Sequence, residues 1–371
     1  MVLLLGSTGV LAADPSLAAY LYPLQDPYLA TIIGTPTEYE PIPPEKIEYS
    51  LNSFKVFPDR AIPDVFWYQG EFRYSLSYQK GEAPLVFVIA GTGSSFYSSS
   101  MVFLQKILYH AGFHVICISS PTQMNFIVNA SESCTPGYIV DDARDLYRVM
   151  TMAWEQVKDR IKVSEFYLMG YSLGASQSAF IAKLDEEKRV FNFKKVCMIN
   201  PAVSLYSSAK RLDDMLLEIV PNRRSPEVFD RWLDSMLGKF GEAYRMLNHP
   251  DLDHDFLYDV YRKLYKTHPF RQENLAGMIG TVFRNLKSRN PGLSKESLIE
   301  ASSLRSIASY LRNTPKIILM GNEDDLILRP ADLVFLNDVF GSRAKFYPIG
   351  GHHGNMSYKD NVAYMINFFK N

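Results

Sequence analysis

The sequence predicts an α/β protein with a mostly parallel central sheet and helices on both faces of it. Short apolar runs alternate with segments of helical periodicity, and this alternation is typical of right-handed βαβ units. The apolar runs are continuous, as expected for strands that are buried on both faces. The alternation stops over 205–312, where only helical signals are found, so we expect a helical cap inserted into the α/β core.

The first half of the predicted core, 46–204, begins with two weak strand signals near 48–57 and 72–80. The apolar run over 83–93 ends in glycines, which predicts a buried strand followed by a tight loop. Leu146, Met150, Ala153 and Val157 lie on one face of a helical pattern. In chain order the further elements are a helix over 99–111, a strand over 113–120, a helix over 138–157, a strand over 165–170, a helix over 172–184 and a strand over 194–202.

Within the predicted cap, Ser225-Pro226 indicates one helix start and Ser294, after Asn290-Pro291-Gly292, indicates another. The second half of the core, 313–371, resumes the earlier alternation. Its expected elements are a strand over 315–321, a helix near 330–340, a strand over 344–351 and a helix near 357–369.

Composition excludes several classes of protein. The 371 residues are 47% apolar and 21% charged, which is ordinary for a globular chain that buries a large core. The net charge of −1 lacks the basic bias that nucleic-acid binding requires. No apolar run reaches 18 residues, so we expect no transmembrane span. The three cysteines form neither a disulfide framework nor a metal-ligand spacing, and Cys117 and Cys197 lie in apolar runs that predict burial.

The N-terminus favours a targeting segment followed by an arm. Residues 1–13, MVLLLGSTGVLAA, resemble the apolar region and small-residue cleavage site of a secretory signal, although no basic residue precedes them. We therefore expect a signal-peptide remnant and a periplasmic or secreted protein. The alternative is an apolar N-terminal arm on a cytoplasmic protein. Residues 14–45 are rich in Pro and Tyr without a clear period, which predicts an extended arm on the surface.

The stretch Glu165–Phe180, EFYLMGYSLGASQSAF, contains the pattern G-x-S-x-G around Ser172. The pattern alone is weak, but here it lies where a buried strand meets a helix, as a nucleophile elbow requires. Such a turn lifts the serine oxygen clear of the sheet and places the next backbone N–H at a helix N-terminus, where positive partial charge is available. The context favours Ser172 as a nucleophile over a mere turn residue.

A nucleophilic serine needs a base, and the base needs an orienting group. Parallel sheets gather their sites at the carboxyl ends of the strands. The loop after the last predicted strand carries His352 and His353, and the loop after 315–321 carries Glu323, Asp324 and Asp325. These positions predict the chain order Ser…Asp…His.

These residues resemble the α/β-hydrolase family of serine hydrolases with a helical cap, and the resemblance runs from about Pro84 to the C-terminus without the cap. It implies Ser172 as nucleophile and Asp324, three residues after Gly321, as the acid, with Asp325 or Glu323 as alternatives. It implies His352, between a Gly-Gly pair and x-Gly, as the base, with His353 as the alternative. The oxyanion donors would be the backbone amides of Leu173 and Thr92, the latter in a loop that lacks the family's common His-Gly.

The resemblance implies hydrolysis of a carboxylic ester, on a small-molecule or lipid-like acyl substrate, without a cofactor. The alternatives are an amidase, a thioesterase, an acyltransferase or a catalytically silent binding protein on the same fold. We expect no metal: the stretch 248–255, NHPDLDHD, lacks a defined ligand spacing and is interpreted as a polar loop. Gly91-Thr92-Gly93 lacks the later glycine of a dinucleotide fingerprint.

Overall fold

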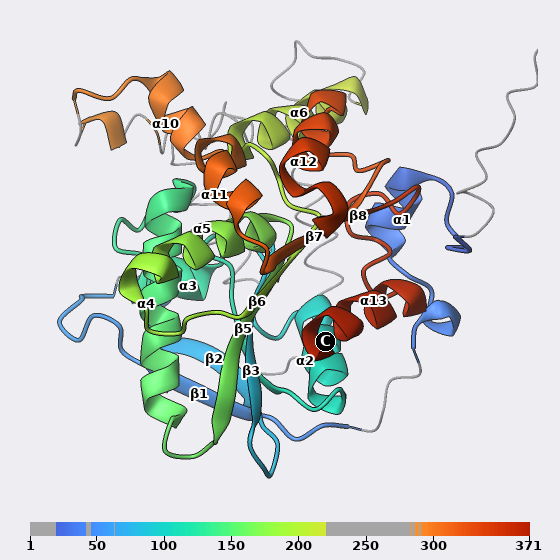
Figure 1. Cartoon of the computed structure of the whole chain (residues 1–371). Helices are drawn as coiled ribbons and strands as arrows, with labels where there is room; N and C mark the ends of the chain where they lie inside the picture. The colour runs from blue at the N-terminus through green and yellow to red at the C-terminus, as the bar shows by residue number, and fades with distance from the viewer. Residues whose placement is uncertain (1–19, 42–45, 63, 220–282, 284–285, 289–290) are drawn as a thin grey trace, which may run out of the picture.

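The computed structural model describes residues 20–41, 46–62, 64–219, 283, 286–288 and 291–371. These residues form one eight-stranded sheet with helices on both faces (Figure 1), which confirms the predicted fold class. Across the sheet the strands lie in the order β1-β2-β4-β3-β5-β6-β7-β8. Their bounds are Ser50–Phe54, Phe72–Ser77, Ala83–Ile89, His114–Ile118, Val163–Tyr171, Lys195–Ile199, Ile317–Asn322 and Ala344–Tyr347 for β1 to β8.

One strand of the sheet runs against the others. β2 pairs antiparallel with both β1 and β4, whereas β4, β3, β5, β6, β7 and β8 pair in parallel. This order, with the antiparallel strand next to the β1 edge, is that of the α/β-hydrolase fold. The carboxyl ends of the six parallel strands therefore meet at one rim of the sheet, which is where a site is expected.

Two apolar cores lie on opposite faces of the sheet. β3 illustrates why its sequence is apolar throughout, since Phe87 faces the larger core and Val86 and Val88 face the other. On one face lie α3 (Met124–Asn129), α4 (Ile139–Val157), α5 (Leu173–Lys188), α11 (Ala308–Asn313) and α12 (Pro330–Phe340); on the other lie α2 (Ser99–His110) and α13 (Lys359–Lys370) (Figure 1). Cys117 and Cys197 are buried in the second core, as predicted.

Residues 20–41 are not uniformly extended. They contain helix α1 (Pro27–Ile33) and a 3-10 turn over Thr37–Tyr39. The sequence signals for α1 are present: the Asp26 side chain accepts a hydrogen bond from the Leu29 amide at 2.9 Å, and Gly34 ends the helix at φ 76°. The helix was missed because a helix of only seven residues is too short to show a detectable period.

The described part of the predicted cap is helical. It comprises α6 (Leu205–Ile219), α10 (Lys295–Ala301), a 3-10 turn (Leu304–Ile307) and α11, with Ser294 as the predicted N-cap of α10. Leu304, Ile307 and Leu311 are buried in the larger sheet core, so this end of the block packs with the core. The Ser225 helix start and the stretch 248–255 lie outside the described residues. In the described part of the chain, no helix has the length and apolarity needed to cross a membrane.

Candidate active site

Ser172 lies in a strained turn between β5 and α5. Its φ and ψ of 54° and −124° fall outside the regions that non-glycine residues normally adopt. The Ser172 amide donates to the carbonyl of Ile199 at the end of β6, at 2.8 Å. The hydrogen bond to β6 therefore helps to hold the strained backbone, and Ser172 lies at the carboxyl end of β5, a central strand of the parallel sheet.

The glycines of the pattern are required by close backbone packing. A Cβ at Gly170 would lie 2.3 Å from the carbonyl oxygen of Gly174, and a Cβ at Gly174 would lie 2.3 Å from that of Ile89. Both distances are far inside van der Waals contact. The sequence pattern thus reflects how tightly the elbow folds against β3.

His352 is the histidine that reaches the serine. Its Nε2 atom lies 2.8 Å from Oγ of Ser172, although the two residues are 180 positions apart. The His352 side chain is 12% exposed, so only a small part of it contacts solvent. The predicted pairing of Ser172 with His352 is therefore present in the fold.

The acid that contacts His352 is Asp325. The expectation that Asp324 orients the histidine is therefore wrong. Nδ1 of His352 lies 3.0 and 3.1 Å from the two carboxylate oxygens of Asp325. Asp324 instead accepts hydrogen bonds from the amides of Gly350 and Gly351, at 3.1 and 2.9 Å. The reason is the turn after β7, which brings the Asp325 amide back to the Asn322 carbonyl and directs these adjacent side chains to different partners.

Asp325 is a fully enclosed carboxylate with several donors. Its side chain is 0% exposed, and besides His352 it accepts from the Ile327 amide at 3.0 Å and from Nδ2 of Asn200 at 2.8 Å. These donors compensate the cost of burying the charge. Asn200, at φ 46°, was missed by the sequence analysis; the only signal was an amide at the end of an apolar strand.

The two predicted oxyanion donors belong to the residue after Ser172 and to the loop after β3. Leu173 is the first residue of α5, where a backbone N–H has no acceptor within the helix. On the other side, a Cβ at Gly91 would lie 3.2 Å from Cβ of Ser172, so the loop carrying Thr92 passes against the nucleophile. The amide of the next residue, Gly93, donates to Oγ1 of Thr122 at 2.7 Å, which favours Thr92 over Gly93 as the donor.

His353, the alternative base, packs behind the site. Its ring centroid lies 4.6 Å from that of His352 and 5.3 Å from that of Tyr171. Burial, reinforced by the neighbouring His352, lowers the pKa of His353 to about 3. The His353 ring is thus a neutral packing group, and in the part of the chain that the structure describes it is His352 that hydrogen-bonds to Ser172.

The other histidines do not join this site in the described part of the chain. His114 is buried at the start of β4, where Nδ1 accepts from the Gln79 amide and Nε2 lies 2.9 Å from the Lys162 carbonyl. His249, His254 and His268 lie outside the described residues. Within the described ranges, no group of three His, Cys, Asp or Glu side chains could hold a metal ion.

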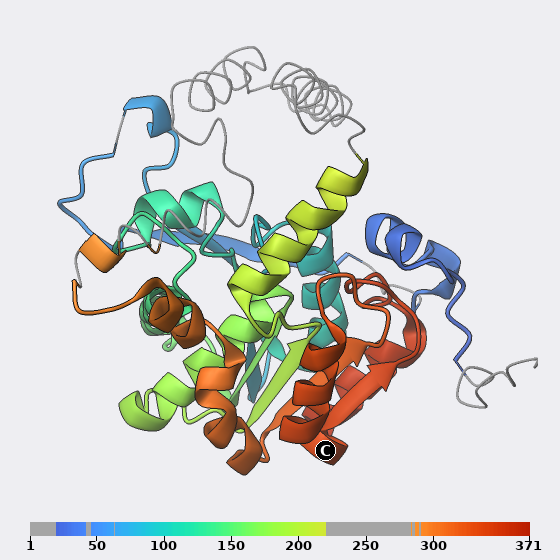
Figure 2. The ribbon, with the colours of Figure 1, turned by 90° about the horizontal axis from the view of Figure 1, so that it is seen from above.

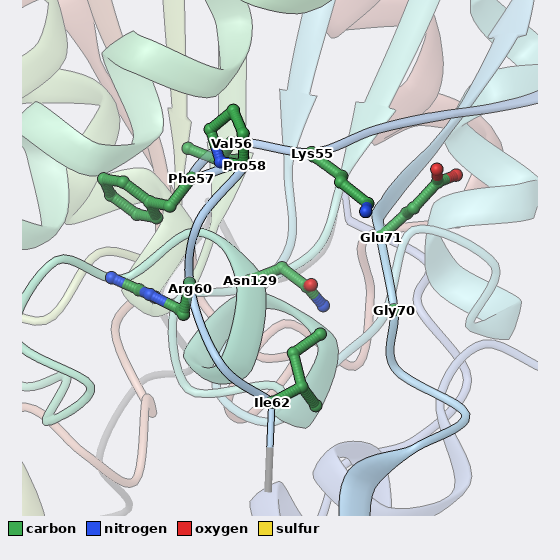
Figure 3. Close-up of a pocket in the computed structure, with 9 residues that line it drawn as sticks. All are labelled: Lys55, Val56, Phe57, Pro58, Arg60, Ile62, Gly70, Glu71 and Asn129. Atoms are coloured by element: carbon green, nitrogen blue, oxygen red, sulfur yellow. The ribbon is translucent and has the colours of Figure 1, made fainter.

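A separate pocket of about 320 Å³ lies near the β1 edge of the same rim (Figure 3). The register of β1 with β2 and of β2 with β4 places Phe54 and Gly70 near the carboxyl end of β4. The pocket is lined by Lys55, Val56, Phe57, Pro58, Arg60, Ile62, Gly70, Glu71 and Asn129. None of the residues around Ser172 lines it, so we do not assign this pocket to the candidate active site.

Comparisons with known proteins find similar solved structures but no matching sequence. No family model matches the chain, and no curated protein sequence matches it. Among solved structures it is similar to an esterase of Pyrococcus furiosus (12% identity, TM-score 0.47, 87% of this chain and 91% of that one). It is also similar to the α/β hydrolase GrgF from Penicillium sp. sh18 (14%, 0.49, 87% and 98%) and to an esterase of Pyrobaculum calidifontis (15%, 0.44, 88% and 85%). Sequence identities of 12–15% say nothing about the reaction that this chain catalyses, which has to be inferred from its own residues.

Proposed function

We propose that this protein is a serine hydrolase that cleaves carboxylic esters through an acyl-enzyme. The observation that carries the proposal is the continuous hydrogen-bonded chain from Oγ of Ser172 through both ring nitrogens of His352 to Asp325. A serine hydroxyl is a weak nucleophile on its own, and an imidazole held in this position can take its proton.

In the first step, Nε2 of His352 accepts the proton as Oγ of Ser172 attacks the ester carbonyl. Asp325 keeps the proton on Nδ1 and stabilises the imidazolium that forms. The imidazolium then protonates the leaving alcohol, and the acyl group remains on Ser172. In the second step, His352 takes a proton from water as the water oxygen attacks the acyl carbonyl. The bond between the acyl carbon and Oγ of Ser172 then breaks, the His352 imidazolium returns the proton to Oγ, and the carboxylic acid leaves.

Negative charge on the carbonyl oxygen is stabilised by backbone amides. The Leu173 amide lies at a helix N-terminus, where the partial positive charge of the helix adds to the hydrogen bond. The Thr92 amide supplies the second donor from the loop after β3. Each donor of this kind contributes about 3 kcal/mol to transition-state stabilisation.

The proposed substrate is a small-molecule or lipid-like acyl ester, and the same residues are compatible with amide or thioester hydrolysis and with acyl transfer. Ester, amide and thioester hydrolysis differ in the leaving group. Acyl transfer differs in the molecule that accepts the acyl group from Ser172. A catalytically silent protein is the alternative from another class. It would bind an acyl compound under the same elbow without forming a covalent bond to Ser172.

The test combines an active-site probe with turnover. We expect a fluorophosphonate to label wild-type protein at Ser172, and p-nitrophenyl esters of graded acyl length to be hydrolysed. The variant Ser172→Ala should lose both properties while retaining its circular dichroism spectrum and melting temperature. Labelling that persists in Ser172→Ala would refute the assignment, and a folded wild type that neither labels nor turns over would favour the silent binding protein.

A further inference from the structure

Helix α1 packs on the loop that carries His352. Figure 1 and Figure 2 both place α1, near the start of the described chain, beside the segment that follows β8. Oγ1 of Thr31 accepts a hydrogen bond from the backbone amide of His352 at 2.8 Å, and donates its own proton to the Pro27 carbonyl at 2.6 Å. Oγ1 of Thr35 donates to the Gly354 carbonyl at 2.9 Å. A segment more than 300 residues earlier in the sequence thus contacts the main chain of the proposed base.

The approach of α1 is close enough to require glycine in the loop. A Cβ at Gly351 would lie 2.2 Å from the Pro27 carbonyl oxygen, and a Cβ at Gly354 would lie 2.0 Å from that of Ala30. The two glycines beside the His352-His353 pair therefore admit a helix backbone. Glycine at these two positions leaves room for the backbone of α1, in addition to any flexibility that it gives the loop.

Three consecutive amides of this loop each have an acceptor. Asp324 accepts from Gly350 and Gly351, and Thr31 accepts from His352. Asp324 belongs to the core loop after β7, so its contact forms with the core itself. The third acceptor comes from outside the predicted core, and it acts on the residue whose ring contacts Ser172.

We propose that Thr31 is a positioning residue, through which the N-terminal helix α1 holds His352 in reach of Ser172. The inference rests on the proposed function of His352 as general base. Without the Thr31 hydroxyl, the His352 amide loses its acceptor and the loop can shift toward another partner. A displacement of about 1 Å at a catalytic group costs about 100-fold in rate. Thr31 lies on α1 and acts through the backbone of His352, so we expect the chemical step to change more than substrate binding.

The test compares Thr31→Val with two matched variants. Valine has nearly the shape of threonine but cannot accept a hydrogen bond, whereas Thr31→Ser keeps the hydroxyl. Thr37→Val makes the same chemical change at an exposed position of the same arm, where no hydrogen bond of the side chain is described. We expect Thr31→Val to lower kcat about 10- to 100-fold with KM changed less than about twofold. Thr31→Ser should recover most of kcat, and Thr37→Val should match wild type.

A second measurement follows the hydrogen bond itself. Hydrogen exchange of the peptide that contains His352 should be at least about 10-fold faster in Thr31→Val than in wild type, and unchanged in Thr37→Val. Wild-type kcat and wild-type exchange in a folded Thr31→Val would overturn the inference. A fall in kcat that Thr31→Ser does not recover would also overturn it, because the packing of α1 and not the hydroxyl would then be responsible.

The two proposals fail in different ways. If Ser172→Ala keeps full activity, the proposed function fails, while the exchange measurement still reports whether Thr31 holds the His352 amide. If Ser172 is labelled by the fluorophosphonate and Thr31→Val is labelled at the wild-type rate, the proposed function stands and the positioning role of Thr31 is lost.

Discussion

Asp324 and Asp325 are adjacent in sequence, yet they hold different parts of the same loop. Asp325 bonds the imidazole of His352, and Asp324 bonds the backbone amides of Gly350 and Gly351. Burial raises the pKa of Asp324, and its two amide donors oppose that shift. One carboxylate therefore orients the ring, while the other shapes the turn that presents it.

Exchange of each carboxylate for an amide separates these roles. In Asp325→Asn the amide favours the wrong imidazole tautomer and cannot stabilise the imidazolium, so we expect kcat to fall about 10³- to 10⁴-fold. In Asp324→Asn the remaining carbonyl oxygen still accepts from a loop amide, and we expect a loss below about 10-fold. The measurement is kcat on a p-nitrophenyl ester, with the melting temperature as the folding control. A larger loss in Asp324→Asn than in Asp325→Asn would reverse our assignment.

Asn200 should matter to the rate through Asp325. Its Nδ2 atom donates to Asp325 at 2.8 Å inside the core. Asn200→Ala removes that donor, and we expect kcat to fall about 10-fold because the carboxylate is less firmly held. Asn200→Asp places a second acid beside a buried carboxylate, and we expect a larger loss and a lower melting temperature. Equal kcat in Asn200→Ala and wild type would show that the other donors to Asp325 suffice.

Glycine at 170 should be essential for folding. An alanine Cβ there would lie 2.3 Å from the Gly174 carbonyl oxygen, and relief of that clash must move the elbow. We expect Gly170→Ala to lose at least about 3 kcal/mol in the free energy of unfolding. The control is Gly81→Ala in the exposed connection between β2 and β3, where no atom lies within 4 Å of an added Cβ. This variant should remain within about 0.5 kcal/mol of wild type by urea denaturation; similar losses in both would count against the packing argument.

His353 should make the protein sensitive to acid. The pKa of His353 is about 3 in the folded protein, against 6.5 for a free histidine side chain, which we take for the unfolded chain. Between these two pH values the unfolded chain binds a proton at His353 that the folded chain does not. The free energy of unfolding therefore falls as the pH falls from 6.5 toward 3, by at most about 1.4 kcal/mol per pH unit from this residue. Asparagine is a suitable replacement for His353, because it tolerates the positive φ of 52° at this position.

The variant His353→Asn should consequently lose less stability than wild type between pH 7 and pH 4.5. We would measure urea denaturation at both pH values, with kcat at pH 7.5 to check that His352 remains in place. An identical loss in the two proteins would mean that His353 does not titrate in this way. Asp324, whose pKa is raised, acts in the opposite sense and cannot produce this acid sensitivity.

Much of the fold could be predicted because burial on both faces leaves a direct record in the sequence. The strands from β3 to β7 contain continuous apolar runs, and Leu146, Met150, Ala153 and Val157 are buried along α4 as their spacing indicated. Helices α1 and α3 were missed, since each is two turns or fewer and too short for a period.

The sequence by itself determined the class of fold, the elbow around Ser172 and the loop of His352, because these depend on local glycine placement and strand burial. Only the tertiary structure decided that Asp325 faces the imidazole, that Asn200 supports it and that Thr31 contacts the His352 amide. The physical reason is that adjacent side chains on a turn point in different directions. A sequence motif therefore cannot tell which of two neighbouring aspartates faces the histidine. Contacts between segments hundreds of residues apart depend on packing that no local pattern encodes.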